Sequence, residues 1–412
     1  MAPRRFVHAG WPRHLLWILI VLGVGVGLGE AGLRAVGFSY YWSLYKRVDP
    51  QRGWGPPAGA EGWQRLEGEA LVRINQVGMR DRLRPLQKSP GTFRIAVLGD
   101  SFAEAVQLPI EQAFWFTLER VLTDCAALRG RKIEVMNFGV SGYSTAQELL
   151  TLRHRVWPYQ PDVVLLAFFH GNDLTENSRV LDDDPLRPYF VYSRDELVLD
   201  ASFRQSPSYQ IRTAWYGRLG FALLDRSRLL QAIDRATDLL GLRYRQWQTS
   251  RGAIDDTPQE PGVDNRIYRK PQDPRWQEAW RVTEGLLEQM HQEVIAHGAR
   301  FFVVTLSTGA QVHPAPQFRE HFQRALGVAD LFYPDRRIRA LGERDGFPVL
   351  NLAPNMHLFA TLSGVWLHGF ENSRLGVGHW NHVGHRLAGT LIAEALCRRQ
   401  QDHLQAKQWG KH

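Results

Sequence analysis

The feature that most constrains this fold is an alternation of short apolar runs and amphipathic segments that begins at residue 93. The expected strands cover residues 93–98, 133–137, 163–169, 300–306 and 348–352. The expected helices cover residues 110–127, 145–157, 275–297, 334–344 and 383–399, to within a few residues at each end. Strands that alternate with helices predict a parallel sheet covered by helices on both faces. The sequence therefore predicts an α/β fold with a sheet of about five strands.

The first apolar run ends in a residue pair that can carry chemistry. Residues 94–99 read Arg-Ile-Ala-Val-Leu-Gly, and Asp100 and Ser101 follow directly. In open α/β sheets, ligands bind outside the carboxyl ends of the strands. We therefore expect Ser101 at the functional edge of the sheet. The simpler interpretation of Ser101 is a helix N-cap, a common position for serine.

Composition narrows the class of protein. The chain has 412 residues, of which 44% are hydrophobic and 22% charged, as in ordinary globular proteins. Lysine and arginine exceed aspartate and glutamate by 50 to 42, and the net charge of +8 favours anionic surfaces. We find no basic run, zinc spacing or aromatic-basic strip, so a nucleic acid is not the expected partner.

The two cysteines, Cys125 and Cys397, do not have metal-binding spacing. Both fall on expected helices, where a buried free thiol is the simpler interpretation. A single bridge between them is the open alternative.

The N-terminus has the pattern of a membrane anchor. Residues 1–14 carry arginines and no acid, and residues 15–28 form an apolar run. That run is shorter than the roughly 20 residues that span a bilayer, but it continues to Leu33, with Glu30 near the far interface. Aromatic residues between 38 and 45 resemble an interfacial belt. We predict a single-pass, uncleaved signal anchor, with a cleaved signal peptide as the alternative.

The basic leader also predicts the orientation of this anchor. Positive residues tend to stay in the cytoplasm, which places the chain after Phe38 on the extracytoplasmic side of the membrane. Lys46, Arg47 and Arg52 beyond the apolar run work against this orientation.

These patterns divide the chain into regions. We predict a leader and anchor over 1–38, a loop-rich lead-in over 39–92, a catalytic domain over 93–400 and a C-terminal tail over 401–412. An insertion at about 174–273 interrupts the strand and helix rhythm, with an amphipathic helix near 209–242. It is interpreted either as a lid or specificity element over the strand ends or as a peripheral excursion.

Three further blocks fall after expected strands or before the last helix. Residues 137–143, Asn-Phe-Gly-Val-Ser-Gly-Tyr, follow the second strand, and residues 171–173, Gly-Asn-Asp, follow the third. Residues 378–385, Gly-His-Trp-Asn-His-Val-Gly-His, precede the last helix. Together with Ser101 they supply the residue types that acyl transfer requires.

These blocks suggest a catalytic serine mechanism. Serine needs a positioned base, for which His379 is the candidate, and the developing oxyanion needs preorganised donors. We assign those donors to the Ser101 amide, the Gly139 amide and the Asn172 side chain. The helix that begins near Ser101 adds a favourable dipole. Asp100 and Asp173 are expected to brace loops by accepting backbone hydrogen bonds.

In this order, the blocks resemble the SGNH (GDSL-like) hydrolase superfamily, whose serine, glycine, asparagine and histidine match Ser101, Gly139, Asn172 and His379. The anchor, followed by the segment 74–81, looks like the membrane-anchored bacterial members. The resemblance implies a flavodoxin-like three-layer α/β/α sandwich. It also implies hydrolysis of esters or transfer of acyl groups, often acetyl groups on carbohydrates, without metal or organic cofactor.

One position departs from the family pattern. The family usually has an aspartate two or three residues before the catalytic histidine, where this chain has Val377 and Gly376. Either a backbone carbonyl orients His379 in a dyad, or an acid from elsewhere does so, with Glu371 the nearest upstream candidate. Loss of a triad acid costs orders of magnitude in rate, which adds a slow or inactive enzyme to the alternatives.

Three functions are compatible with these residues. The first is a serine esterase or O-acyltransferase acting on an acylated saccharide or a similar ester. The second is a weak or inactive envelope protein that binds glycans or aids their assembly. The third is a lipid esterase or thioesterase. The histidines His382 and His385 lack a matching acid cluster, so a metal site is not predicted. The oligomeric state is left open.

Overall fold

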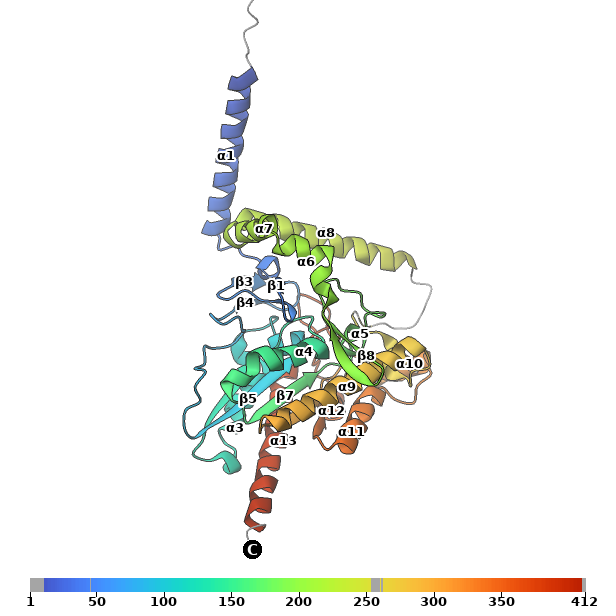
Figure 1. The fold of residues 1–412 in the computed structure, drawn as a ribbon. Coiled ribbons are helices and arrows are strands. Elements are labelled where there is room, and N and C mark those ends of the chain that lie inside the picture. The colour runs from blue at the N-terminus through green and yellow to red at the C-terminus, as the bar shows by residue number, and fades with distance from the viewer. Residues whose placement is uncertain (1–10, 45, 253–259, 261, 410–412) are drawn as a thin grey trace, which may run out of the picture.

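A computed structural model describes residues 11–44, 46–252, 260 and 262–409, and it contains the expected parallel sheet (Figure 1). The five strands of this sheet are β5 (Thr92–Gly99), β6 (Lys132–Asn137), β7 (Val163–Phe168), β10 (Arg300–Thr305) and β11 (Val349–Asn351). Their order is β11-β10-β7-β5-β6, and every pair is parallel. This is the flavodoxin-like order, with β5 as the first strand. The predicted fold class is confirmed.

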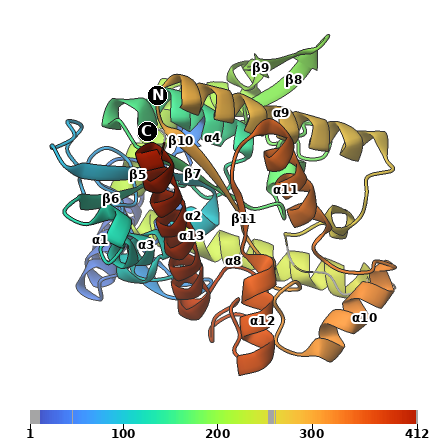
Figure 2. The same ribbon diagram turned by 90° about the horizontal axis from the view of Figure 1, so that it is seen from below.

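Helices cover both faces of the sheet. Those of the α/β domain are α2 (Ser101–Glu104), α3 (Phe114–Leu122), α4 (Thr145–Thr151), α5 (Asp173–Glu176), α9 (Pro274–Ala296), α10 (Pro316–Leu326), α11 (Tyr333–Asp345), α12 (Ala353–Ser363) and α13 (His382–Trp409). Figure 2 shows α4 and α9 on one side of the sheet and α3 and α13 on the other. Because both faces are covered, all eight residues of β5 are buried.

Several helices differ from the sequence expectation. The expected helix over 110–127 is three pieces, the 3₁₀ turns η2 (Ile110–Gln112) and η3 (Ala126–Leu128) around α3. The one over 145–157 continues after α4 as a π-helical turn, Leu152–Val156, and the 3₁₀ turn Trp157–Tyr159. Helices α10 and α12 were not predicted. The expected tail is a continuation of α13 as far as Trp409, and residues 410–412 lie outside the described residues.

The lead-in has more regular structure than its Gly- and Pro-rich sequence predicts. It begins with the 3₁₀ turn η1 (Tyr41–Leu44) and contains two hairpins, β1 (Arg47–Asp49) with β2 (Gly53–Gly55) and β3 (Glu61–Gln64) with β4 (Ala70–Arg73). Arg80 fixes the end of the lead-in to the α/β domain. Its buried guanidinium donates to the carbonyls of Glu104, Ala105 and Leu108, each at 2.6 Å. The lead-in therefore packs against the segment that carries Ser101.

The N-terminal apolar run forms α1 (Trp11–Ala35). Its stretch from His14 to Ala35 is long and apolar enough to cross a membrane, and none of it is buried in the protein. At about 1.5 Å per residue, this 22-residue stretch covers about 33 Å, which matches a hydrocarbon core of about 30 Å. The first part of the leader, residues 1–10, lies outside the described residues.

The insertion forms a hairpin and a helical layer. The hairpin is β8 (Tyr189–Ser193) with β9 (Glu196–Asp200), and the 3₁₀ turn η6 (Ser202–Gln205) follows. The helical layer consists of α6 (Pro207–Thr213), α7 (Trp215–Arg226) and α8 (Arg228–Gly252), and the 3₁₀ turn η7 (Asn265–Tyr268) leads back to the domain. In Figure 1 this layer lies between α1 and the α/β domain.

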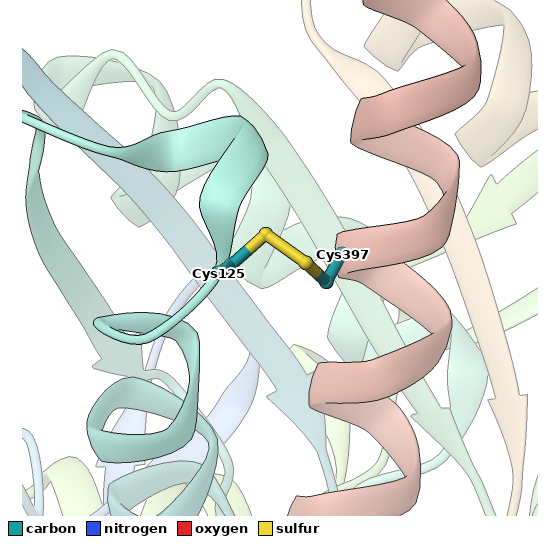
Figure 3. Close-up of a disulfide and its surroundings, with 2 residues drawn as sticks. All are labelled: Cys125 and Cys397. Carbon is teal, nitrogen blue, oxygen red and sulfur yellow. A yellow bond between two sulfur atoms is a disulfide. The ribbon is translucent and has the colours of Figure 1, made fainter.

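Cys125 and Cys397 form a disulfide (Figure 3). The expectation of two free thiols was wrong, and the open alternative of a single bridge is correct. Cys125 lies just before η3 rather than within a helix, and the helix α13 packs along α3. The two sulfur atoms therefore meet although they are 272 positions apart in the chain. The bridge fastens the last helix to the first half of the domain.

Candidate active site

Ser101 lies at the carboxyl end of the central strand. It is the first residue of α2, directly after β5, and the preceding residue, Asp100, caps this short helix by accepting a hydrogen bond from the Phe102 amide at 2.9 Å. Capping at this point is therefore performed by Asp100, so the N-cap interpretation of Ser101 does not hold. The Ser101 side chain is free to make a bond outside the helix.

That bond is made with His379. The Ser101 Oγ lies 2.7 Å from His379 Nε2, although 278 positions separate the two residues. His379 is in the loop before α13, and its carbonyl accepts a hydrogen bond from the Gly369 amide at 2.9 Å. Its ring packs on that of Phe102, with the centroids 5.0 Å apart. The expected nucleophile and base are thus brought into direct contact.

The carboxylate that contacts His379 is Glu67. Its Oε2 lies 2.5 Å from His379 Nδ1, and its Oε1 accepts a hydrogen bond from the His379 amide at 2.8 Å. Glu67 is in the loop between β3 and β4, within the lead-in. Of the two alternatives left open by the sequence, a backbone carbonyl and an acid from elsewhere in the chain, the structure has the second. The candidate acid was wrong, because Glu371 is exposed and Glu67 contacts the ring.

The contact between Glu67 and His379 shifts the pKa of both groups. Burial by itself lowers the pKa of His379, but the charge and hydrogen bond of Glu67 outweigh it and raise the pKa above its ordinary value. Burial by itself raises the pKa of Glu67, but the charge of His379 and its hydrogen bonds outweigh it and lower the pKa. The pair thus favours imidazolium beside carboxylate, the state formed when His379 accepts a proton.

A glycine is required for this approach of Glu67. Gly378 has a φ of +81°, in the left-handed region, and a Cβ built on it would lie 2.4 Å from Glu67 Oε1. Any side chain at position 378 would therefore strain the backbone and displace the carboxylate. The glycine before His379 makes room for an acid that comes from a distant part of the chain.

The buried side chains of His368 and Ser307 hold the backbone of the loop that carries His379. His368 Nδ1 lies 2.6 Å from the Gly378 carbonyl oxygen, and its Nε2 lies 3.0 Å from Ser307 Oγ. The Trp380 indole also donates to Ser307 Oγ, at 2.9 Å. Burial lowers the pKa of His368 to about 4, so His368 is neutral at pH 7 and donates from Nδ1 to the carbonyl. Sequence reasoning missed Ser307 and His368, because neither lies in a recognisable block.

Asn172 lies at the same edge, held by Asp100. Asn172 Nδ2 donates to Asp100 Oδ2 at 3.0 Å. An amide nitrogen has two hydrogens, so one is available for a reacting oxygen. Burial raises the pKa of Asp100 to about 6, and its hydrogen bonds with the Phe102 amide and Asn172 act in the opposite direction. Asp100 thus connects the strand end that carries Ser101 to the one that carries Asn172.

Gly139 has a different arrangement from the one expected. Its amide donates to the Asn137 side-chain oxygen at 3.0 Å, so this N–H is engaged within its own turn. A Cβ at position 139 would lie 2.4 Å from the Ala103 Cβ, so the absence of a side chain allows the turn to pack against α2. In this structure Gly139 supports the segment of Ser101 by close packing.

The remaining candidates are structural. Asp173 accepts from the Phe169 amide at 2.9 Å and from the Thr145 hydroxyl at 3.2 Å, as expected for a loop brace. His385 Nδ1 accepts from the Phe114 amide at 3.2 Å and is buried. Within the described part of the chain, no group of three His, Cys, Asp or Glu side chains is arranged to hold a metal ion.

A surface depression of about 410 Å³ lies beside the Glu67 and His379 loops. Its lining includes Gly68, Phe370, Asn372 and His382. Asn372 ties the two loops together, since its side chain accepts from the Gly68 amide and donates to the Gly68 carbonyl, both at 2.8 Å. The depression offers apolar, amide and carboxylate side chains, the last from Glu69 and Glu371.

Comparisons with known proteins complete this description. No family model matches the chain, and no curated protein matches it. Solved structures match with low sequence identity. They include the acetyl xylan esterase AlAXEase, with 12% sequence identity and a TM-score of 0.35. That match covers 74% of this chain and 99% of the esterase. A lipase/acylhydrolase from Enterococcus faecalis matches at 13% identity, 75% and 97% coverage and a TM-score of 0.34. A mutant acetyl-xylooligosaccharide esterase from Geobacillus matches at 11% identity, 76% and 96% coverage and a TM-score of 0.36.

Proposed function

We propose that this protein is a serine-dependent enzyme that hydrolyses a carboxylic ester or transfers its acyl group. The observation that carries the proposal is the continuous chain of contacts from Ser101 Oγ to His379 Nε2 at 2.7 Å and from His379 Nδ1 to Glu67 Oε2 at 2.5 Å. A nucleophile, a base and an orienting acid within hydrogen-bond reach define the serine triad on any fold.

In the proposed reaction, Ser101 Oγ attacks the ester carbonyl while His379 Nε2 accepts the hydroxyl proton. Glu67 keeps the Nδ1 proton in place and stabilises the imidazolium that forms. His379 then gives its proton to the leaving alcohol, which leaves an acyl group on Ser101. Water or a saccharide hydroxyl, deprotonated by His379, attacks the carbonyl of this acyl group. The bond to Ser101 Oγ then breaks, His379 returns its proton to Ser101 Oγ, and the carboxylic acid or the acylated saccharide leaves.

The negative oxygen of the tetrahedral intermediate needs donors. We assign these to the Ser101 amide, at the start of α2, and to the second hydrogen on Asn172 Nδ2. Asp100 holds Asn172 in position through their 3.0 Å hydrogen bond. For Gly139, whose amide is engaged by Asn137, we propose a packing role under α2 in place of the predicted donor role.

The proposed substrate is an acetylated or otherwise short-acylated saccharide outside the cytoplasm. The depression beside the Glu67 and His379 loops is lined by apolar, amide and carboxylate side chains, which can contact the rings and hydroxyl groups of a sugar. The apolar helix α1 supports a membrane anchor, and the disulfide supports an oxidising compartment. The alternative of an inactive binding protein was based on the absence of an acid before His379. Because Glu67 contacts His379, that reason no longer applies.

The test measures hydrolysis of p-nitrophenyl acetate by the purified full chain. We expect Ser101→Ala and His379→Ala each to lower kcat by at least about 10³-fold. The matched control is Glu343→Gln, an exposed residue near the end of α11, which should have wild-type activity. Full activity of Ser101→Ala would contradict the proposal. Comparing release of acetate with its transfer to added xylo-oligosaccharides then distinguishes hydrolysis from acyl transfer.

A further inference from the structure

The helical layer α6–α8 leaves a row of large apolar side chains without cover. On α7 the exposed residues include Trp215, Leu219 and Leu223, at spacings of four residues, so they form one stripe along the helix. On α8 they include Ile233 and Leu240, seven residues apart and therefore again on one stripe. Trp215 is 76% exposed and Leu240 is 65% exposed, the highest fractions among the large apolar side chains that the structure describes in this layer.

The opposite face of α8 is attached to the domain. Gln231 is fully buried and its Oε1 accepts from the Tyr40 amide at 3.3 Å, while Asp238 accepts from the Tyr40 hydroxyl at 2.9 Å. At about 100° per residue, Asp238 lies about 20° around the helix from Gln231, whereas Ile233 and Leu240 lie about 160–180° from it. The apolar stripe of α8 therefore points away from the domain.

Glu30 fixes the level of this layer relative to the anchor. Glu30 is in the last part of α1, and its carboxylate accepts from the amides of Arg228 and Leu229 at 3.0 and 2.9 Å. It also accepts from the Ser227 hydroxyl at 3.0 Å. Glu30 thus caps the N-terminus of α8. If α1 spans a bilayer, a charged carboxylate near its end belongs at the edge of the hydrocarbon, and α8 would start at the same level.

The orientation of α7 and α8 relative to α1 also suits a helical layer that lies along a bilayer surface. Figure 1 shows α1 standing over one end of the layer while α7 and α8 run across it. If α1 crosses a bilayer, α7 and α8 lie along its surface with their outer faces toward the lipid. Arg34 and Arg226 are exposed at the junction of α1 with the layer, where the Arg34 guanidinium donates to the Arg226 carbonyl. Arg218 is exposed further along α7. Phospholipid headgroups would lie at this level. Arginines beside an apolar face are typical of interfacial helices.

We infer that α6–α8 form a membrane-resting platform, with the apolar stripes of α7 and α8 inserted at the headgroup boundary of the bilayer that α1 spans. The occupant of this face is lipid. The inference depends on the proposed anchor and goes beyond it, because an anchor alone leaves the domain free to move on a tether. The platform instead fixes the domain against the membrane.

The platform brings the catalytic edge close to the membrane. Tyr41 is six positions after Ala35, the last residue of α1, so the two are no more than about 22 Å apart. The Tyr41 hydroxyl donates to Glu104 of α2 at 2.6 Å, and Glu104 Oε2 accepts from the Ser141 amide at 2.8 Å. The end of the anchor is thus linked, through buried contacts, to the short helix that begins with Ser101.

The test uses the full chain in phosphatidylcholine and phosphatidylglycerol vesicles. Both native cysteines are in the disulfide, so a thiol-reactive fluorophore labels a single introduced cysteine. Probes are placed by Ile233→Cys and Leu240→Cys on the platform. The matched control is Ile295→Cys, which replaces an isoleucine that is 54% exposed, on α9 just before the amino end of β10. Quenching by brominated lipid and by aqueous iodide is measured at each position.

We expect brominated lipid to quench both platform probes, and iodide to quench them several-fold less than the control. Iodide quenching equal to that of the control would overturn the inference. Protection from iodide without quenching by lipid would also overturn it, because a second copy or another protein would then cover the face. A probe at Val21→Cys, in α1, separates the two proposals. Lipid quenching there, without quenching on the platform, retains the anchor and rejects the platform.

Discussion

The carboxylate of Glu67 contacts the imidazole of His379 across 312 positions of the chain, with a distance of 2.5 Å between Oε2 and Nδ1. The acid therefore precedes Ser101 in sequence, and it is carried by a hairpin outside the parallel sheet. The lead-in is part of the site and does more than connect α1 to the domain. Its hairpin, together with Gly378, provides the group that the segment before His379 lacks.

Replacement of this acid tests its role as the orienting group. We expect Glu67→Gln to lower kcat by about 10²–10⁴-fold with a small change in KM, because the amide neither fixes the tautomer nor stabilises the imidazolium. The measurement is steady-state hydrolysis of an aryl acetate. Glu343→Gln, on the exposed side of α11, serves as control. A similar loss in both variants would show that the effect is not specific to position 67.

The pH dependence follows from the raised pKa of His379. The base works only when neutral, so kcat/KM is expected to rise with pH through an apparent pKa above the ordinary value of 6.5. In Glu67→Gln this limb should move to lower pH, because the charge that stabilises the imidazolium is absent. Profiles of kcat/KM between pH 5 and 9 measure the rising limb in the wild type and in Glu67→Gln. An unchanged limb in the variant would exclude Glu67 as the cause of the raised pKa.

The same pair predicts a pH window of stability. A raised pKa of His379 stabilises the fold below about pH 6.5, and this contribution is lost as the pH rises through the folded-state value. A lowered pKa of Glu67 stabilises the fold above about pH 4.5 and is lost as the pH falls. The free energy of unfolding should therefore differ most between wild type and Glu67→Gln from about pH 4.5 to 6.5. Urea denaturation of both proteins at pH 5.5 and pH 9 measures this difference in the free energy of unfolding. A larger difference at pH 9 than at pH 5.5 would contradict the assignment.

The hydrogen bond between Asp100 and Asn172 predicts coupled effects. Asn172→Ala removes a proposed oxyanion donor and should lower kcat by about 10²–10³-fold. Asp100→Asn keeps the size of the side chain but loses a charged acceptor, and it should give a smaller loss. In the double variant we expect little more than the effect of Asn172→Ala, since Asp100 acts through Asn172. Additive losses in a double-mutant cycle would mean that the two residues act independently.

The disulfide predicts a stability effect without a catalytic one. It closes a loop of about 270 residues and lies away from the triad. Replacing both residues, Cys125→Ala with Cys397→Ala, should lower the free energy of unfolding by about 2–5 kcal/mol. Activity at 25 °C should be retained. Denaturant titration, with wild type under reducing conditions as the comparison, measures the loss. A wild-type midpoint in the variant would show that the bridge does not stabilise the fold.

Periodicity predicted the sheet because its signal is local. Each strand of the sheet is a buried apolar run, and buried runs between amphipathic helices indicate a parallel sheet. The prediction failed where no such signal exists. The helix α12 begins with Ala-Pro-Asn, residues that also occur in turns. A turn at Cys125 separates α3 from η3, although both lie within one expected helix. The contact between Cys125 and Cys397 depends on how α13 packs along α3, which periodicity does not encode.

The site was predictable only where its residues follow strands. Ser101 and Asn172 come directly after buried runs, and His379 precedes the last helix, so topology brings them to one edge. Glu67 lies in a Gly-rich stretch with other acids nearby, and nothing local distinguishes it from Glu69. Its selection depends on where the β3–β4 loop docks, which is a long-range property. Gly139 was predicted as a donor from its motif, yet its amide bonds to its own turn.

The central claim is that Ser101 is a nucleophile activated by the Glu67–His379 pair. Its most direct test is covalent labelling of the full chain with a fluorophosphonate, followed by mass spectrometry of the modified peptide. We predict one phosphonate on Ser101, labelling that is slower in Glu67→Gln and His379→Ala, and no labelling in Ser101→Ala. Modification of another residue, or labelling of Ser101→Ala at the wild-type rate, would contradict the claim.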